Sequence, residues 1–409
     1  MNILVVHRAW YPTGGDWTYV ENVVSIYEHK GHNVIPFSMH DERNAPSPYS
    51  DYFIENIDYK NVKRGIMSGV KVVMKSIYSF EAQRNLERLL DNVQIDFAHL
   101  NVIHHYITPT ILKILKKRNI PIIWTLHEYT PICPDSIFVS HGEVCERCYG
   151  GKFYNCITHS CKKGSYLAST VAALENYIHK YLNYYEYVDH YVCASNFQLE
   201  KYKQFGFFND KLVQIYHGYD YATVEIARQS SGKTDEKYIV FVGRLEKIKG
   251  AHTLLKAMQS HPGIKLKIVG DGGQEAELLA FKGANGLDNV HFLGKKDKLE
   301  LLKIINGSEF LICPSECYEV LGFTVVEAMA MGKPVIGAAI GGIPEMVIDN
   351  YTGLLFQPGD AVQLAAHIGI LYNNESLIAE MGKNAEIHIN KIVNNDTHFQ
   401  NLQKLIPGL

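Results

Sequence analysis

Short apolar runs alternate along this chain with longer segments in which apolar residues recur at helical spacing. This alternation is typical of a parallel β-sheet covered by helices on both faces, because its strands are buried on both sides. The pattern predicts six strands in the first half of the chain, at residues 2–7, 33–39, 96–101, 121–126, 190–194 and 212–216. It then starts again and predicts six more, at residues 238–243, 265–269, 290–293, 310–313, 334–338 and 353–356.

The repeated pattern predicts two α/β domains, each a doubly wound, Rossmann-like sheet. A chain of 409 residues also exceeds what one hydrophobic core usually serves. Residues 227–237 are polar and are interpreted as a linker between domains at 1–226 and 238–390, while 391–409 is expected to form a helix that packs back on the first domain. Such sheets bind ligands at the carboxyl ends of their strands, so we expect the two domains to face a central cleft.

Composition and charge narrow the classes of partner. The 40 basic and 43 acidic residues give a net charge of -3, so no nucleic acid partner is expected. No apolar run approaches the roughly 20 residues of a membrane span, and the start MNILVVHRAW lacks the pattern of a signal peptide. We therefore expect a cytoplasmic chain.

Two turns that follow predicted strands carry residues suited to binding an anion. Gly14 and Gly15 precede a helical segment, where glycines let the backbone approach a ligand and the helix start attracts negative charge. Arg244 and Lys249 follow strand 238–243, and two cations at a strand end suit a diphosphate. Taken alone, the first pair also fits an ordinary tight turn, and the second also fits two solvated charges.

A third feature points to the same place as Arg244 and Lys249. Glu319 precedes, and Glu327 lies within, the segment FTVVEAMAM, which is predicted to be a buried helix that starts near Gly322. The unpaired N–H groups of a helix start favour phosphate. Positions eight apart in a rigid helix are separated by about 12 Å, beyond the roughly 5 to 9.5 Å between glycosidase carboxylates, although a loop could shorten this distance. We therefore expect the two glutamates to hold different parts of one ligand.

These motifs together resemble the donor domain of the retaining glycosyltransferases of family four, which have the GT-B architecture of two Rossmann-like domains facing a cleft. The resemblance covers most of the chain and rests on these segments: GRLEKIKG, IVGDGG, FLG at 292–294, PSECYEVLGFTVVEAMAMGKPVIG, KGH at 30–32, TLHE at 125–128, IYHGYD at 215–220 and LLFQPGD. Two positions depart from the family pattern: His217 replaces the usual asparagine, and Val320 replaces glycine, proline or serine. Both positions lie in expected loops, so they bear on which substrate is bound rather than on the class of enzyme.

The resemblance implies a role for each matching residue. Arg244 and Lys249 would neutralise the diphosphate of a nucleotide sugar, and Glu327 would hydrogen-bond the ribose hydroxyls. Glu319 would hold the donor sugar together with the backbone of the next three residues, Val320, Leu321 and Gly322. Further donor contacts are expected at strand ends and turns, from Gly14, Gly15, Gly243, Gly270 and Leu293. These roles agree with chemistry in which stabilising the departing diphosphate contributes most to catalysis.

The first domain is expected to supply His127, which follows strand 121–126. The resemblance places His127 at the reacting centre beside a sugar hydroxyl and makes it catalytic together with Arg244, Lys249 and Glu319, although a histidine at a strand end is more often a structural residue. The chain contains no D-x-D triplet, the motif of metal-assisted nucleotide-sugar binding. No catalytic metal is therefore expected, and retention of the anomeric configuration is implied by the resemblance.

Five of the eight cysteines fall within residues 133–161. Cys145 and Cys148 form a C-x-x-C pair, and Cys156 and Cys161 follow. In a cytosolic chain this spacing predicts a structural zinc site formed by these four thiolates, in an insert with too little core packing to hold itself. Reduced unpaired cysteines, disulfides and an iron cluster are the alternatives. Three other cysteines, Cys193, Cys313 and Cys317, are expected to be small apolar fillers near strands.

The acceptor and the competing functions are less constrained. Residues 60–80 contain five basic and no acidic side chains, which as a helix would suit an anionic membrane surface at the inner face of the membrane and a lipid-linked acceptor; a solvated basic face is the alternative. We expect a nucleotide-sugar donor and a saccharide or lipid-linked saccharide acceptor, as in surface polysaccharide assembly. The competing hypotheses are a non-catalytic nucleotide-sugar binding protein, and another GT-B enzyme such as a phosphorylase or an epimerase. The oligomeric state is not predicted.

Overall fold

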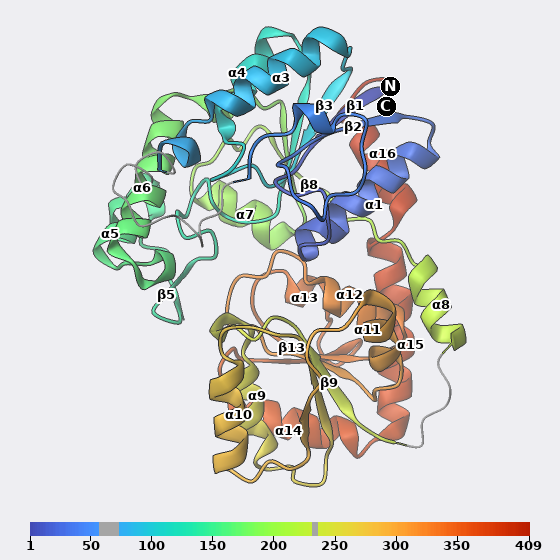
Figure 1. Cartoon of the computed structure of the whole chain (residues 1–409). Helices are drawn as coiled ribbons and strands as arrows, with labels where there is room; N and C mark the ends of the chain where they lie inside the picture. The colour runs from blue at the N-terminus through green and yellow to red at the C-terminus, as the bar shows by residue number, and fades with distance from the viewer. Residues whose placement is uncertain (57–72, 231–235) are drawn as a thin grey trace. The chain divides into compact units, whose positions relative to one another are not determined.

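The computed structural model describes residues 1–56, 73–230 and 236–409, which divide into two compact units. The first unit comprises Met1–His141, Cys145–Gly218 and Asn395–Leu409, and the second comprises Gly142–Val144 and Tyr219–Asn394. Each unit contains one six-stranded parallel sheet with helices on its two faces (Figure 1). The sequence-based prediction of two doubly wound α/β domains is therefore confirmed.

The sheet of the first unit has the order β2-β1-β3-β4-β7-β8. Its strands are β1 (Asn2–Val6), β2 (Asn33–Phe37), β3 (Phe97–Leu100), β4 (Ile122–Leu126), β7 (His190–Cys193) and β8 (Leu212–Gln214). Its helices are α1 (Gly15–His29), α3 (Phe80–Asn92), α4 (Leu112–Lys117), α5 (Tyr154–Thr158), α6 (Tyr166–Tyr181), α7 (Asn196–Gln204) and α16 (Asn395–Gln403). The strands form an almost continuous buried core, as parallel strands between two helical layers must.

The sheet of the second unit has the order β11-β10-β9-β12-β13-β14. Its strands are β9 (Ile239–Val242), β10 (Leu266–Val269), β11 (Val290–Phe292), β12 (Leu311–Cys313), β13 (Val335–Ala338) and β14 (Gly353–Phe356). Its helices are α8 (Ala222–Ser230), α9 (Ala251–Met258), α10 (Glu275–Ala284), α11 (Lys298–Asn306), α12 (Phe323–Ala330), α13 (Ile343–Met346), α14 (Ala361–Tyr372) and α15 (Glu375–Ile392). All twelve predicted strands are present; β14 has the predicted bounds, and each of the others is shorter than predicted by at most two residues at either end.

The unit boundary differs from the expected one. The second unit begins at Tyr219, because α8 packs with α11 of that unit, whereas the sequence pattern places the boundary at residue 226. Helix α8 also extends to Ser230, so the expected linker at 227–237 begins inside a helix, and residues 231–235 lie outside the described residues. The expected C-terminal helical segment 391–409 contains the end of α15 as well as α16. Residues Asn395–Leu409 belong to the first unit.

The cysteine-rich insert is more ordered than its glycine content predicts. It contains the short strands β5 (Val139–Ser140) and β6 (Glu143–Val144) and the helix α5. Helix α5 packs on α6, and a small core forms from Cys148, Phe153, Cys156 and Ala173. The expectation that the insert lacks core packing is therefore wrong, because α6 supplies an apolar wall that follows the insert in the sequence.

Two expectations concern membranes. None of the described helices is long and apolar enough to span a bilayer. Most of the basic segment 60–80 lies outside the described residues, so its proposed amphipathic face stays a prediction.

Candidate functional site

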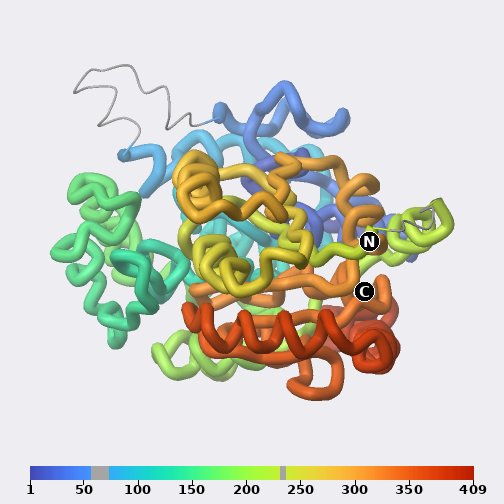
Figure 2. Tube along the Cα trace, turned by 90° about the horizontal axis from the view of Figure 1, so that it is seen from below, coloured from blue at the N-terminus to red at the C-terminus, as the bar shows by residue number. Residues whose placement is uncertain are grey.

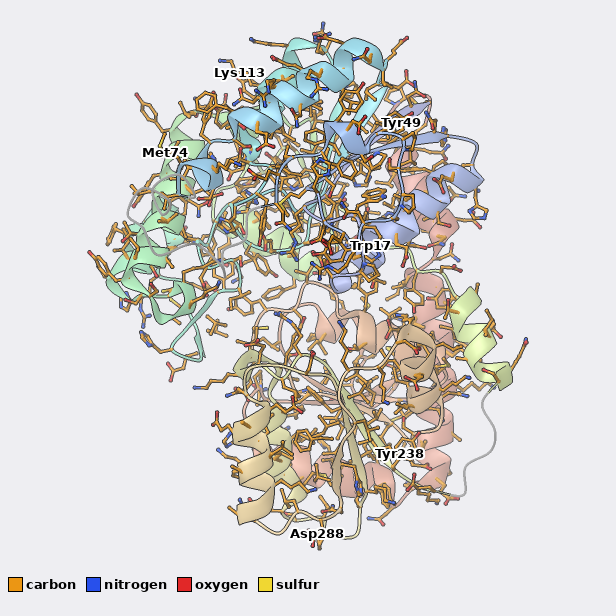
Figure 3. The ribbon with its side chains drawn as sticks, in the orientation of Figure 1. Trp17, Tyr49, Met74, Lys113, Tyr238 and Asp288 are labelled. Atoms are coloured by element: carbon orange, nitrogen blue, oxygen red, sulfur yellow. The ribbon has the colours of Figure 1, made fainter. Side chains whose placement is uncertain are left out.

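The second sheet reverses its strand order between β9 and β12, where a doubly wound sheet binds its ligand at the carboxyl ends of the strands. Tyr238 and Asp288 precede β9 and β11 and mark the opposite, amino-terminal edge (Figure 3). Arg244 and Lys249 follow β9, and Ser315 follows β12, so the two cations and the start of the glutamate loop meet at the reversal point. The fold thus brings together the residues that the sequence pattern grouped.

Lys249 and Glu319 form an ion pair. The Ser315 hydroxyl donates to Glu319 Oε1 at 2.7 Å, and both charged side chains are mostly buried. Burial alone raises the pKa of Glu319 and lowers that of Lys249, but the mutual attraction prevails, so the pKa of Glu319 is lowered and that of Lys249 is raised. Both groups are therefore charged at neutral pH, and Lys249 is held in place at the strand ends.

A glycine allows this close approach. Gly250 directly follows Lys249 and has a φ of 71°, and a Cβ atom there would lie 1.8 Å from the Pro314 carbonyl oxygen. Any other residue would push the loop after β9 away from the loop after β12. Gly250 therefore sets the position of Lys249 relative to Glu319.

Helix α12 begins between the two glutamates. Its N-cap residue is Gly322, in the left-handed conformation with a φ of 87°, and no side chain caps the helix. The start of the helix therefore has N–H groups available for a ligand, and its dipole favours an anion. Leu321 is buried, whereas Val320 is partly exposed. The predicted start of this helix is confirmed.

Glu327 lies in the second turn of α12 and is only 3% exposed. Its Oε1 atom pairs with Lys298 and accepts a longer hydrogen bond, 3.5 Å, from the Tyr219 hydroxyl. Its Oε2 atom is buried, and no hydrogen-bond partner lies within reach among the described residues. A buried carboxylate oxygen without a partner is costly, so this atom is available for a ligand that donates hydrogen bonds.

The remaining donor residues of the second unit lie at the ends of adjacent strands. Gly243 N–H donates to Val269 O at 3.0 Å, and Leu293 N–H donates to Ile268 O at 2.9 Å. Gly270 has a φ of 140°, and a Cβ atom there would lie 1.9 Å from Gly243 O. These backbones form one continuous edge beside Arg244, although no contact identifies them as ligand-binding residues.

The first sheet reverses its order between β1 and β3. Gly14 is the N-cap of α1, which begins at Gly15, and Asp16 lies in its first turn. Asp16 Oδ2 accepts from Arg8 at 3.0 Å and lies 3.2 Å from His7 Nε2. Burial raises the pKa of Asp16, but the hydrogen bond with His7 and the charge of Arg8 lower it overall, so the carboxylate is charged at the helix start. The Asp16 carboxylate therefore neutralises part of the positive potential at the start of α1.

His127 follows β4 at the same edge as Asn101, which follows β3. Asn101 Nδ2 contacts the carbonyl oxygens of Val6 and His99, so its Oδ1 atom faces His127 Nε2 at 2.9 Å. His127 Nε2 therefore donates, and Nδ1 carries the lone pair. Burial lowers the pKa of His127 to about 3, so the ring is neutral at neutral pH and suited to accepting a hydrogen bond from a hydroxyl group.

The four cysteines of the expected zinc site lie in or next to the insert's small core. Across residues 133–161, all of which the structure describes, no three His, Cys, Asp or Glu side chains are arranged to hold a metal ion. Cys145 accepts a contact from Arg147, and Cys156 donates to Cys161, which lowers the pKa of Cys161 and raises that of Cys156. All eight cysteines are free thiols. The zinc site stays a prediction without geometric support.

Several partners were not identified from the sequence. Lys298 in KKDKLE and Asn101 carry no motif that marks them, because they reach Glu327 and His127 only through the folding of distant segments. Tyr219 lies in IYHGYD and Ser315 in PSECYE, so the resemblance passes through both residues without assigning them a role. A position at the carboxyl end of a predicted strand, or within two residues after it, is the one signal that could have identified Asn101 and Ser315.

Comparison with known proteins identifies the family. Residues 13–223 match the family described as Glycosyltransferase Family 4, and residues 223–388 match the one described as Glycosyl transferases group 1. The chain is 26% identical over 387 residues to the uncharacterized glycosyltransferase MJ1178 of Methanocaldococcus jannaschii, which covers 94% of this chain and 92% of that protein. Further curated relatives are matched over 33% to 57% of their own length.

Two solved structures share the fold. Sucrose-phosphate synthase from Thermosynechococcus elongatus has a TM-score of 0.72 at 21% identity, over 98% of both chains. HepE of Anabaena in complex with UDP-glucose has a TM-score of 0.66 at 19% identity, over 100% of both chains. Since the family match spans more than half of this chain and the fold agrees, the chain belongs to glycosyltransferase family 4 and has the GT-B fold.

Proposed function

We propose that this chain transfers a hexose-type sugar from a UDP- or GDP-sugar to a saccharide or lipid-linked saccharide, with retention of the anomeric configuration, in the assembly of surface polysaccharide. The family membership supports glycosyl transfer, and the UDP-glucose bound to the HepE structure supports a nucleotide-sugar donor. The retention, the choice of donor and the acceptor belong to the proposal.

One observation carries the donor assignment: the buried and unpartnered Oε2 atom of Glu327. Among the described residues it is one of few buried side-chain oxygens in this state, and it lies on the helix whose open start favours phosphate. A ribose offers two neighbouring hydroxyl donors, and a diphosphate attached to it would extend toward positive charge. Glu327 and the start of α12 therefore fit two ends of one nucleoside diphosphate.

In the proposed reaction, the bond between the anomeric carbon and the diphosphate breaks, and the diphosphate leaves with the bonding electrons. Lys249, Arg244 and the start of α12 stabilise the negative charge that develops on the departing oxygen. Glu319 orients Lys249 through their ion pair and binds a donor-sugar hydroxyl through its remaining acceptor capacity. The acceptor hydroxyl bonds to the anomeric carbon from the face that the diphosphate leaves, and its proton passes to the departing phosphate oxygen.

The first unit would bind the acceptor side of the reaction. His127 presents a neutral ring whose Nδ1 atom accepts a hydrogen bond, which suits positioning a sugar hydroxyl. A ring with a pKa of about 3 is a weak base, so His127 orients the hydroxyl rather than removing its proton before bond formation.

A donor screen tests the proposal. Thermal unfolding of the full chain is followed with UDP, GDP and ADP sugars, and release of the nucleoside diphosphate is then measured for each compound that raises the midpoint. The proposal predicts stabilisation by a uridine or guanosine donor and slow release of its diphosphate. Stabilisation without release from any donor would support a non-catalytic binding protein, and release that requires inorganic phosphate would support a phosphorylase.

A further inference from the structure

Helix α6 exposes an apolar face. The α6 stripe, defined as Leu167, Leu174, Tyr177 and Tyr181, follows the three- and four-residue spacing of one helix face, and its members are 72%, 44%, 36% and 85% exposed. The opposite face is also apolar in part and is buried against the rest of the unit. A surface helix normally presents polar side chains to water. An exposed apolar face on a packed helix therefore indicates a site that binds another molecule or a membrane.

The stripe lies on a firm support. Tyr177 is in edge contact with Phe153, with ring centroids 5.1 Å apart, and its hydroxyl accepts from the Tyr154 N–H at 3.1 Å. On the buried side of the helix, His179 contacts Ile77 O at 2.7 Å, which ties α6 to the segment before α3. Figures 1 and 2 both show α5 and α6 side by side at the margin of their unit. Met74, which is 60% exposed, lies three residues before Ile77 (Figure 3).

The segment that contains the insert's second half and α6 is rich in basic side chains. From residue 147 to residue 181 the chain contains five basic side chains: Arg147, Lys152, Lys162, Lys163 and Lys180. The only acidic side chain in this range is Glu175, which is 1% exposed and paired with His105. Residues 147–181 are therefore net positive on a chain whose net charge is -3, with exposed Glu143 and Glu186 outside this range.

We propose that the α6 stripe and its basic border dock the protein on a bilayer that contains anionic lipid. Leucine side chains gain free energy by entering the acyl region, tyrosine side chains suit the headgroup level, and lysines beside them attract anionic headgroups. A carbohydrate or an acidic protein surface would not need the leucines, and an apolar protein partner would not need the lysines beside them. The proposal concerns a surface outside the donor site and does not depend on the donor chemistry.

Sedimentation with vesicles tests this docking without any sugar substrate. The full chain is mixed with two kinds of vesicle, one of phosphatidylcholine alone and one of phosphatidylcholine with about 30% phosphatidylserine. We expect at least tenfold stronger binding to the anionic vesicles, because several lysines each add to the attraction. The triple variant Leu167→Ser, Leu174→Ser, Tyr181→Ser should lose at least tenfold of that binding, and Lys152→Gln, Lys163→Gln, Lys180→Gln should reduce it to the level of neutral vesicles.

Matched controls come from exposed residues elsewhere. Val362, Ile370 and Ile387 are 82%, 53% and 58% exposed on α14 and α15, and their triple serine variant should bind as the unchanged chain does. Lys113→Gln with Lys117→Gln on α4 is the control for charge. Circular dichroism and thermal midpoints of all variants establish that each is folded. Equal vesicle binding by the stripe variant and the unchanged chain overturns the proposal, as does a stripe-dependent dimer in sedimentation equilibrium without vesicle binding.

Discussion

Replacing Glu327 by glutamine should weaken nucleotide binding with little effect on folding. The side chain keeps its size, and Oε1 keeps its neighbours Lys298 and Tyr219. The change replaces Oε2, the buried atom without a protein partner among the described residues, by an amide nitrogen that cannot accept a hydrogen bond.

The size of the effect follows from hydrogen-bond energies. A hydrogen bond to a charged acceptor contributes about 1.5–3 kcal/mol, and loss of its partner leaves a desolvated hydroxyl on the ligand. We therefore expect a loss of about 2–3 kcal/mol, which corresponds to roughly 30- to 150-fold in Kd. The free energy of unfolding should change much less, because the fold gains no hydrogen bond from Oε2 and the ion pair that is lost involves Lys298, which is 41% exposed to solvent.

Calorimetric titration with UDP and GDP, and with their 2′,3′-dideoxy analogues, tests the reasoning. The unchanged chain should lose affinity for the analogue, whereas Glu327→Gln should bind both forms with more similar affinity, giving a coupling of at least about 1 kcal/mol. Glu277→Gln, at a largely exposed carboxylate, is the control. If the variant and the unchanged chain show the same ratio between nucleotide and analogue, Glu327 does not bind the ribose.

Other variants and conditions test the remaining assignments. Glu319→Ala should slow sugar transfer at least about 100-fold while nucleotide affinity stays within roughly threefold, because Glu319 orients Lys249. If Glu319→Ala and Glu327→Ala lose nucleotide affinity equally, the two glutamates do not have separate roles. Asn101→Ala should lower kcat about tenfold or more in steady-state assays, because His127 loses its orienting acceptor, and an unchanged kcat would remove that role. Buried His99, His104 and His398 have pKa values lowered to about 3, 3 and 4, so they stay neutral when folded while the unfolded chain takes up protons below about pH 6.5. Stability is therefore lost as pH falls from 6.5, by about 2 kcal/mol per histidine at pH 5, and equal urea midpoints at pH 7 and 5 would refute this. Metal analysis with thiol counting tests the predicted zinc at Cys145, Cys148, Cys156 and Cys161, and four reactive thiols without zinc would exclude it.

The strands and the start of α12 were predictable because their signals are local. A strand buried on both faces must be apolar along its length, and Gly322 before FTVVEAMA marks a helix start on its own. The strand order was not encoded in this way, yet it decides where the site lies, because β9 and β12 become neighbours only in the folded sheet.

The side-chain partners of the site were less predictable. Glu327 meets Lys298 across 29 positions, and this pair depends on how α12 packs against α11. His127 meets Asn101 across 26 positions, and this pair depends on how the ends of β4 and β3 align. The insert was misjudged for a related reason. Its core is completed by Ala173 of α6, which follows the insert in the sequence and gives no sign there of facing it.

The stereochemistry of transfer tests the central claim most directly. A donor that releases its diphosphate in the screen is incubated with the unchanged chain and an acceptor, and the anomeric configuration of the new bond is read by NMR. The account predicts the same anomeric configuration in the product as in the donor, with transfer lost in Lys249→Ala. An inverted product, or transfer that persists in Lys249→Ala, would contradict it.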